Sequence, residues 1–339
     1  MQDTRFESLK LWLDTLPNEL GLKTSTLTPA SSDASFRRYF RVQADNQQIA
    51  SFIVMDAPPD KEDSRPFIHV AQLLLRAQIE VPIIFETDLD KGFLLLSDLG
   101  SKTLYSEINP ENAAHFYNQV SSSLVKLQKN TLTNELPHYD EALLRRELEL
   151  FPDWYLAKHL DYQMTEKEQL DLSIVFDALI ASILDQATVF VHRDFHSRNL
   201  MITPDHEIGV LDFQDAVVGP ITYDLVSIYR DAYLEWSEEQ QVDWMIRYWE
   251  AAKKEGLPVP SDFGEFYKDI EWMGLQRHLK ILGIFARLYH RDAKDGYLKD
   301  IPLVLAYTEK VAQRYSMFRP LVKILDNAQK RLRPDGLTF

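Results

Sequence analysis

The stretch VHRDFHSRNLMI (residues 191–202) decides how this sequence is read. Within it, His192, Asp194 and Asn199 form an H-x-D-x-x-x-x-N pattern. Asp212 follows Asn199 by 13 residues, at the end of a short apolar run. This spacing is typical of a kinase catalytic loop followed by its metal-binding aspartate.

The residue types suit phosphoryl transfer, which depends mainly on positioning and on stabilising the charge of the phosphates. Asp212 and Asn199 offer the hard oxygen donors that Mg²⁺ prefers. The carboxylate of Asp194 is suited to orienting an acceptor hydroxyl and taking its proton. Met201 would place an apolar side chain under the adenine of ATP. We therefore expect ATP and Mg²⁺ as cofactors.

Each of these residues also has an ordinary structural reading. Aspartate and asparagine are common in turns, His192 is a possible hydrogen-bonded core residue, and Asp224 is a possible helix cap. The same residues in this order and at these spacings, behind a β-rich segment, favour the kinase reading.

Composition sets the size and class of the protein. Its 339 residues exceed the length at which one core stops growing, so we expect two lobes. Hydrophobic residues make up 45% of the chain and can fill both cores. The formal charge of −15 disfavours nucleic acid as a partner, because cations to neutralise phosphates are not in excess.

The chain has no cysteine, which removes disulfides, thiolate metal sites and cysteine nucleophiles. Its start lacks the basic and apolar segments of a signal peptide. No apolar run approaches the roughly 18 residues of a membrane span. We expect a cytoplasmic protein without a membrane partner, as a monomer or weak dimer.

Hydrophobic periodicity divides the chain into a β-rich and a helical part. Residues 1–96 predict a small lobe that opens with a helix over 4–20. Its further elements are strands at 39–42, 49–55, 83–86 and 92–96 and a helix at 67–78. Residues 97–100 form a connector, and 101–339 a large helical lobe. Its predicted helices cover 111–130, 139–160, 166–187, 221–235, 238–254, 262–290 and 301–330. The fold class is α+β and bilobal, with strands and loops at 189–201 and 207–212 embedded in the helical lobe.

HRDFHSRN, LDFQDA and GPITYDL together resemble the aminoglycoside phosphotransferase/choline kinase superfamily, which shares the protein-kinase fold. Four further strings look like the bacterial kinases that phosphorylate the anomeric hydroxyl of N-acetylmuramate and N-acetylglucosamine in peptidoglycan recycling. These strings are DASFRRYFRV (33–42), VMDAPPDKEDSRPF (54–67), ELELFPDWYL (147–156) and ILGIFARL (281–288).

The resemblance implies a role for each matching position. Asp194 would be the catalytic base, and Asn199 and Asp212 the magnesium ligands. Asp224, with His192, would brace the catalytic loop. The nucleotide would contact the turn at 31–40, the connector and apolar positions beneath the adenine: Ser32, Ala34, Ser35, Ser97, Leu99, Met201 and Leu211.

Three departures from the protein-kinase pattern stand out. The loop over the phosphates has no glycine, and Met55 stands about where an ATP-binding lysine is expected. Phosphate charge would then be met by Arg38 or Arg41, or by Arg37 or Lys61. The alternative is that these side chains are solvated charges at the strand edge. Only 11 residues, 213–223, separate Asp212 from Asp224, too few for a peptide-binding activation segment. This shortness favours a small acceptor.

The acceptor pocket is expected to pair an aromatic platform with polar groups. Trp154 is the aromatic candidate, with Glu147 beside it in the family string. Arg287, or Arg145 or Arg146, would meet the carboxylate of a muramic acid. His196 either contacts the acceptor or pins the loop. A core role for Trp154 and surface ion pairs for the arginines are the alternatives.

The leading hypothesis is an anomeric amino-sugar kinase with a small sugar-like acceptor. The loop itself does not select the acceptor, so an aminoglycoside or other small-alcohol kinase remains an alternative. The absent lysine is the only support for a nucleotide-binding pseudokinase, against which the intact Asp194, Asn199 and Asp212 argue. A protein kinase is disfavoured by the short 213–223 segment.

Overall fold

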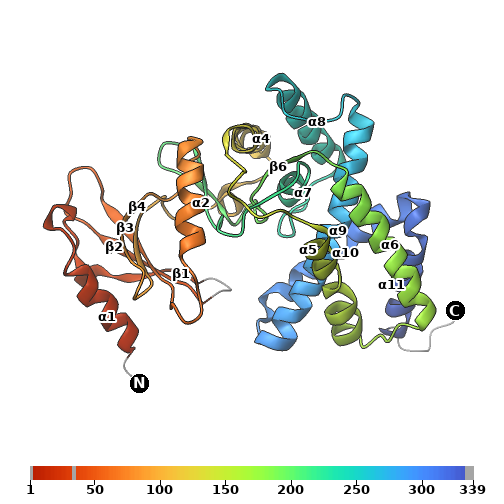
Figure 1. The fold of residues 1–339 in the computed structure, drawn as a ribbon, viewed down its shortest axis with the longest axis horizontal. Helices are drawn as coiled ribbons and strands as arrows, with labels where there is room; N and C mark the ends of the chain where they lie inside the picture. Colours follow the sequence, from red (N-terminus) through yellow and green to blue (C-terminus); the bar gives the residue numbers. More distant parts are fainter. Residues whose placement is uncertain (1–2, 33–35, 333–339) are drawn as a thin grey trace. The chain divides into compact units, whose positions relative to one another are not determined.

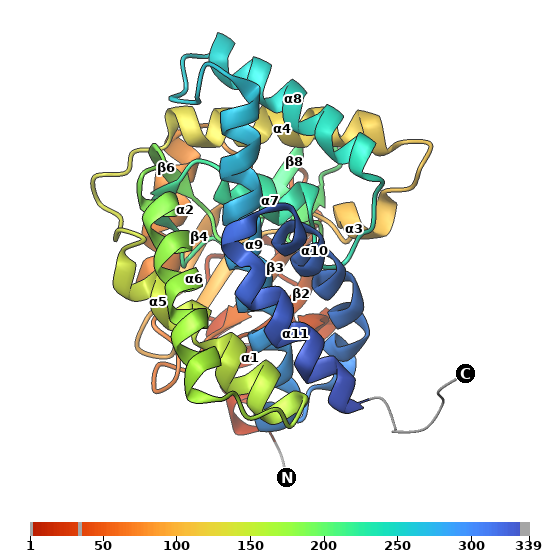
Figure 2. The same ribbon diagram turned by 90° about the vertical axis from the view of Figure 1, so that its right-hand side faces the viewer.

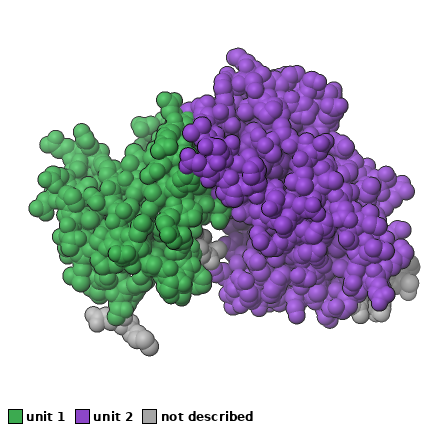
Figure 3. All heavy atoms as spheres, in the orientation of Figure 1, with its two compact units in different colours: residues 1–106, 199–215 green, residues 107–198, 216–339 purple. Residues whose placement is uncertain are grey.

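A computed structural model of the chain describes residues 3–32 and 36–332. The protein divides into two compact units, residues 1–106 with 199–215 and residues 107–198 with 216–339 (Figure 3). The first unit therefore contains a segment from the middle of the chain. Asp194 belongs to the second unit, while Asn199 and Asp212 belong to the first.

Unit 1 is built on a five-stranded antiparallel sheet in the order β1-β2-β3-β5-β4 (Figure 1). Its strands are β1 (Thr28–Ser32), β2 (Arg38–Gln43), β3 (Ser51–Asp56), β4 (Ile84–Asp88) and β5 (Phe93–Ser97). The strands predicted at 39–42 and 49–55 are confirmed as β2 and β3, which pair as an antiparallel hairpin with Phe40 opposite Val54. Strand β1 was not predicted.

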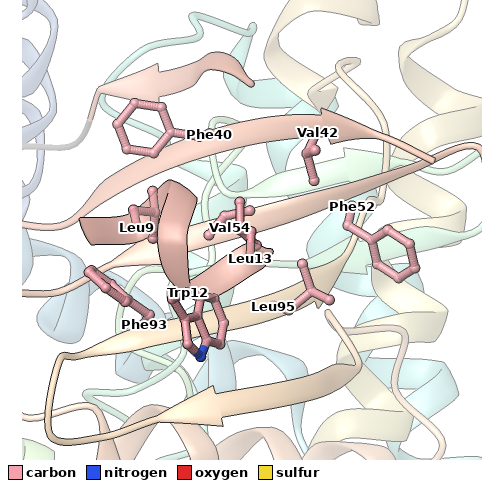
Figure 4. Packing of buried hydrophobic residues seen from close by; sticks show 9 residues of the cluster. All are labelled: Leu9, Trp12, Leu13, Phe40, Val42, Phe52, Val54, Phe93 and Leu95. Carbon is pink, nitrogen blue, oxygen red and sulfur yellow. The ribbon is translucent and has the colours of Figure 1, made fainter. Parts of the chain in front are cut away.

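Helix α1 (Thr4–Leu13) packs on one face of this sheet. Its Leu9, Trp12 and Leu13 are buried against alternate residues of three strands (Figure 4). The strand residues of this core are Phe40, Val42, Phe52, Val54, Phe93 and Leu95. Alternation places them on one face because successive side chains of a strand point to opposite sides. The helix ends at Leu13 rather than Leu20, before Pro17, and residues 18–20 form a 3₁₀ turn.

Helix α2 (Arg65–Arg76) and the hairpin of β7 (Leu200–Ile202) and β8 (Ile208–Val210) complete unit 1. The hairpin is hydrogen-bonded to the N-terminal part of the chain on both sides. The amide of Val210 donates to the Glu80 carbonyl and that of Ile202 to the Lys102 carbonyl, both at 2.8 Å. The metal-ligand candidates are thus fixed to the same unit as the five-stranded sheet.

Unit 2 is mainly helical. Its helices are α4 (Ala113–Asn130), α5 (Glu141–Leu148), the π-helix η3 (Phe151–His159), α6 (Glu166–Leu184), α7 (Tyr223–Tyr229), α8 (Glu238–Lys254), α9 (Phe263–Asp292), the 3₁₀ helix η4 (Asp295–Asp300), α10 (Ile301–Arg314) and α11 (Arg319–Leu332). The short α3 (Leu104–Glu107) joins the units in sequence. Helix α9 packs against η3, α10, α7 and α6, and Figure 2 shows it running through their midst.

Two predicted helices are divided in the structure. The segment 139–160 separates into α5 and η3, with Pro152 at the start of the π-helix. The segment 301–330 separates into α10 and α11 at Tyr315, whose backbone is extended. The strands β6 (Thr188–Val191) and β9 (Val217–Pro220) pair, and the candidate catalytic loop, residues 192–199, follows β6. No helix of the described ranges is long and apolar enough to cross a membrane.

Candidate active site

The catalytic loop leaves β6 at Val191 and is held by a buried carboxylate. Asp224, in the first turn of α7, is fully buried. It accepts hydrogen bonds from the amides of His192 at 2.7 Å and Arg193 at 3.1 Å. Burial raises the pKa of Asp224 to about 7, against the effect of these amides and Arg277. These two hydrogen bonds hold the start of the loop, as expected of a residue that braces it.

Arg193 needs such bracing because its φ is +76°. A non-glycine residue in the left-handed region is strained by about 1–2 kcal/mol. Its guanidinium pairs with Glu147, and its carbonyl accepts from Nη1 of Arg277 at 2.8 Å. The next residue is Asp194, so the strained turn sets where the candidate base lies.

Asp194 faces two buried cations of α9. Burial acts to raise its pKa, but Lys280 and Arg277 hold the pKa of Asp194 below its usual value. The amide of Asp194 donates to Nδ1 of His192 at 3.2 Å. Asp194 is therefore a carboxylate at neutral pH, able to orient a hydroxyl and to accept its proton as transfer completes.

The remainder of the loop is pinned by Asp231 and Tyr233. The amide of Ser197 donates to Oδ2 of Asp231 at 3.0 Å. The ring of His196 lies 5.3 Å from that of Tyr233, and the guanidinium of Arg198 lies 3.5 Å from the same ring centre. Burial lowers the pKa of His196, so its imidazole is neutral at pH 7. These contacts support a structural role for His196 in holding the loop.

In unit 1, the metal-ligand candidates Asn199 and Asp212 touch each other. Nδ2 of Asn199 donates to Oδ2 of Asp212 at 3.3 Å, and the Leu211 amide donates to the Asn199 carbonyl at 2.9 Å. Asp212 has a φ of +62°, the left-handed conformation that aspartate tolerates better than most residues. Nε2 of Gln214 donates to its Oδ1 at 2.7 Å.

This donor pair fits Mg²⁺, which proteins commonly bind through one or two carboxylates together with waters and substrate phosphates. Asn199 and Asp212 would hold it. Within residues 3–32 and 36–332, three or more His, Cys, Asp or Glu side chains do not gather into a metal-binding group. An all-protein cage, as a structural zinc would need, is therefore not part of the described chain.

Of the three arginines Arg37, Arg38 and Arg41, which lie in or next to β2, Arg37 is the one that forms an ion pair with Asp212. Its Nη1 lies 3.9 Å from Oδ1 of Asp212, and its Nη2 lies 3.4 Å from Glu62. Arg38 instead pairs with Asp56 at 2.5 Å and also with Asp3. The structure therefore directs Arg37 to the metal-ligand pair.

Arg41 is likewise engaged elsewhere. Its Nε and Nη2 contact the two oxygens of Asp98 at 2.5 and 2.9 Å, and Nη2 also donates to the Gly100 carbonyl. Such a two-point contact fixes the guanidinium. The structure thus does not bring the predicted nucleotide contacts Arg38 and Arg41 to Asp212.

Two of the apolar candidates for the adenine region, Leu99 and Met201, lie beside Gly209. A Cβ at Gly209 would lie 2.9 Å from Leu99 Cδ1 and 3.3 Å from Met201 Cβ, so a larger residue would not fit without displacing them. Leu99 and Met201 are buried and Leu211 is half-buried. Met55 is fully buried in β3.

Of the remaining predicted nucleotide contacts, Ser97 and Ser32 belong to the five-stranded sheet. The Ser97 amide donates to the Ile83 carbonyl, and its hydroxyl accepts from the Ile83 amide, both at 2.8 Å. Ser97 thereby ties β5 to the start of β4. Ser32 ends β1, paired with Arg38. Ala34 and Ser35 lie outside the described residues.

The residues predicted to contact the acceptor differ in how many contacts their side chains already make within the protein. Glu147 is buried and its two oxygens contact Arg193, Lys280 and the hydroxyl of Tyr139. This carboxylate braces the strained turn, so its place does not support the predicted contact with an acceptor. Trp154 on η3 and Arg287 on α9 are both half-buried. Nε of Arg287 is buried without a hydrogen-bond partner.

A family model agrees with this geometry. The model of the phosphotransferase enzyme family matches residues 26–263. The chain belongs to this family. This phosphotransferase is 46% identical to an N-acetylmuramate/N-acetylglucosamine kinase of Pseudomonas aeruginosa, over 95% of the chain and 96% of that protein. It is 43% identical to a kinase of the same name from Pseudomonas putida, over 98% of each.

Solved structures give the same fold at low identity. A choline kinase from Streptococcus pneumoniae matches with a TM-score of 0.64 at 10% identity, covering 90% of this phosphotransferase and 99% of that chain. An ADP-bound aminoglycoside phosphotransferase matches with a TM-score of 0.59 at 12% identity, covering 92% and 99%. The predicted α+β, protein-kinase-like class and the prediction of a kinase are confirmed.

Sequence reasoning missed three groups of this phosphotransferase that lie around the catalytic loop. Arg277 and Lys280 face Asp194, and Asp231 fixes the Ser197 amide. One signal for the cations was present, because they interrupt the apolar run of a long helix. Buried charges of this kind are rare unless paired.

Proposed function

We propose that this phosphotransferase transfers the γ-phosphate of ATP to the anomeric hydroxyl of N-acetylmuramate and N-acetylglucosamine. The observation that carries the proposal is the near full-length similarity to relatives of that name at 43–46% identity. Asp194 beside Arg277 and Lys280 supplies a carboxylate suited to hydroxyl activation.

Asp194 holds the acceptor hydroxyl and removes its proton. The acceptor oxygen forms the new bond to the γ-phosphorus, the bond from that phosphorus to the bridging oxygen breaks, and ADP leaves with the electron pair. The proton passes to the Asp194 carboxylate. A base with a lowered pKa suffices because the anomeric hydroxyl is more acidic than an ordinary alcohol.

Asn199 and Asp212 would hold Mg²⁺, which when bound offsets the charge of the phosphates. Arg37, next to Asp212, supplies the cation that the absent strand lysine would otherwise provide. We assign residues 97–100 as the connector between a nucleotide-binding lobe at 1–96 and an acceptor-binding lobe at 101–339, from which the segment 199–215 is excepted because it belongs to unit 1. Leu99 and Met201 supply apolar surface for the adenine.

We also propose a cytoplasmic enzyme with small-molecule partners and no membrane partner, and the charge of −15 disfavours nucleic acid as a partner. We expect a monomer or weak dimer.

An acceptor screen tests the proposal. The protein is incubated with Mg-ATP and N-acetylmuramate, N-acetylglucosamine, kanamycin or choline, and the phosphorylated position is read by ³¹P NMR. Sugar 1-phosphates are expected from the two amino sugars. Phosphorylated kanamycin or choline without sugar phosphate would overturn the acceptor assignment.

Asp194→Asn tests the role of the base. Removal of a general base typically lowers turnover about 10²–10⁴-fold, and ATP binding should persist. Asp243→Asn, on the exposed face of α8, is the matched control and should retain full activity. Unchanged turnover in Asp194→Asn would contradict the assignment.

A further inference from the structure

One arginine of unit 2 is poorly supplied with counter-charge. Nε of Arg287 is buried without a hydrogen-bond partner, and burial and the neighbouring Arg291 lower the pKa of Arg287 despite the opposite effect of Asp292. By contrast, Arg145, another arginine considered for binding the acceptor carboxylate, already pairs with Asp177 at 2.5 Å. A half-buried guanidinium in this state favours an anionic partner.

Helix α9 places this arginine in line with the cations that face the catalytic aspartate. Arg277, Lys280, Arg287 and Arg291 follow one another at intervals of three, seven and four residues, and so lie along one face of the helix. Lys280 and Arg287 are separated by about 10 Å along the axis, two helical turns. This separation is comparable to the length of a pyranose ring that carries a short carboxylate-bearing substituent.

A chain of aromatic contacts connects the same part of α9 to the catalytic loop. The ring of His196 lies 5.3 Å from Tyr233, and Tyr233 lies 6.3 Å from Phe285. Phe285 precedes Arg287 by only two residues. The backbone of this segment is therefore held near the loop that carries Asp194, while the Arg287 side chain leaves α9 on a different face from Phe285, the face it shares with Lys280.

Two contacts also align α9 with the π-helix η3. A Cβ on Gly283 would lie 2.4 Å from the carbonyl of Leu150, so the backbones nearly touch there. At the other end, the ring of His159 lies 5.7 Å from that of His290. The two helices run in parallel between these contacts, which brings Trp154 to the height of residues 286–287.

We propose that Arg287 binds the carboxylate of an acidic sugar acceptor and so selects N-acetylmuramate over N-acetylglucosamine. The inference rests on the proposed function, and it assigns the specificity between the two sugars to one side chain. N-acetylmuramate carries a carboxylate on its lactyl arm, whereas N-acetylglucosamine is neutral. Arginine suits this contact because its fork matches a carboxylate in geometry. Trp154 lies at the right height to support the sugar ring.

Steady-state kinetics of Arg287→Met with both sugars test the inference. The loss of a hydrogen-bonded charge pair should raise KM for N-acetylmuramate about ten- to a hundredfold. KM for N-acetylglucosamine should stay within about twofold. The kcat should be unchanged for both sugars, because the lost contact binds the ground state and the transition state equally. Arg287→Lys should fall between, because it keeps the charge and loses the fork.

Arg291→Met is the matched control. Arg291 lies one turn further on the same face, is exposed and pairs with Asp292. It should leave the ratio of the two KM values unchanged. The retained activity on N-acetylglucosamine shows that each variant is folded.

An equal rise in both KM values, or no rise in either, would overturn the role of Arg287 while leaving the proposed function intact. Failure of the unmodified enzyme to phosphorylate either sugar would instead overturn the proposed function.

Discussion

Glu147→Gln is the most informative perturbation of the catalytic loop, because this buried carboxylate contacts two cations. Its Oε1 pairs with Arg193 and lies 2.9 Å from Nζ of Lys280. Its Oε2 accepts from the hydroxyl of Tyr139. Glutamine has the same shape, so the substitution removes the charge and preserves the packing.

The expected loss follows from these contacts. A hydrogen bond to a charged partner contributes about 1.5–3 kcal/mol and a neutral one about 0.5–1.5 kcal/mol. Neutralising Glu147 weakens the contacts with both cations, which amounts to about 2–3 kcal/mol of unfolding free energy. Glu147→Ala, which removes the carboxylate that contacts both buried cations, should cost about 3–5 kcal/mol.

Urea denaturation followed by circular dichroism measures this loss. The exposed Glu141 lies on the same helix and pairs with Arg145 at 3.7 Å. Glu141→Gln, as the control, should change the free energy of unfolding by less than about 0.5 kcal/mol. Because Glu147 also holds the strained Arg193, kcat should fall in Glu147→Gln without a selective change in the acceptor KM.

The effect should depend on pH in a defined direction. Although burial acts to raise it, Lys280 and Arg193 hold the pKa of Glu147 below its usual 4.5. A depressed carboxyl pKa contributes stability that is present above 4.5 and is lost as the pH falls through the folded value. The difference between wild type and Glu147→Gln should therefore shrink below pH 4.5. Equal urea midpoints at pH 7 together with a raised acceptor KM would refute this account and restore Glu147 as an acceptor contact.

Two further substitutions probe the helical unit. Gly283→Ala should destabilise the protein at the upper end of about 1–3 kcal/mol, because its Cβ would meet the Leu150 backbone at 2.4 Å, whereas Gly296→Ala, with open space around it, should be neutral in the same thermal melts. Glu271→Ala should lower the free energy of unfolding by about 3–5 kcal/mol, since it leaves the buried Arg230 without its carboxylate at 3.3 Å; a change below 1 kcal/mol would show that this pair is not stabilising.

Local patterns were sufficient for most elements of the fold. Two short runs rich in β-branched and aromatic residues predicted the strands β2 and β3, and helical periodicity predicted α6 and α8. The ends of these two helices are also encoded locally, since Thr165 and Ser237 each form a capping box. The missed strand β9 contains Gly219 and Pro220, which a sequence reading treats as turn residues.

The parts that could not be predicted depend on partners distant in sequence. Nothing local distinguishes Arg37 from Arg38, yet Arg38 is fixed by Asp56 across the sheet while Arg37 lies by Asp212. The π-helix was also missed, because its wider turn does not produce the expected spacing of apolar residues.

Unit 1 is discontinuous, which constrains the order of assembly during synthesis. The amides of Val210 and Ile202 donate hydrogen bonds to the carbonyls of residues 80 and 102. A fragment ending at residue 106 would thus leave two backbone acceptors without these donors. Completion of unit 1 must wait until the ribosome has passed residue 215, by which point α4, α5, α6 and residues 192–198 have already been made.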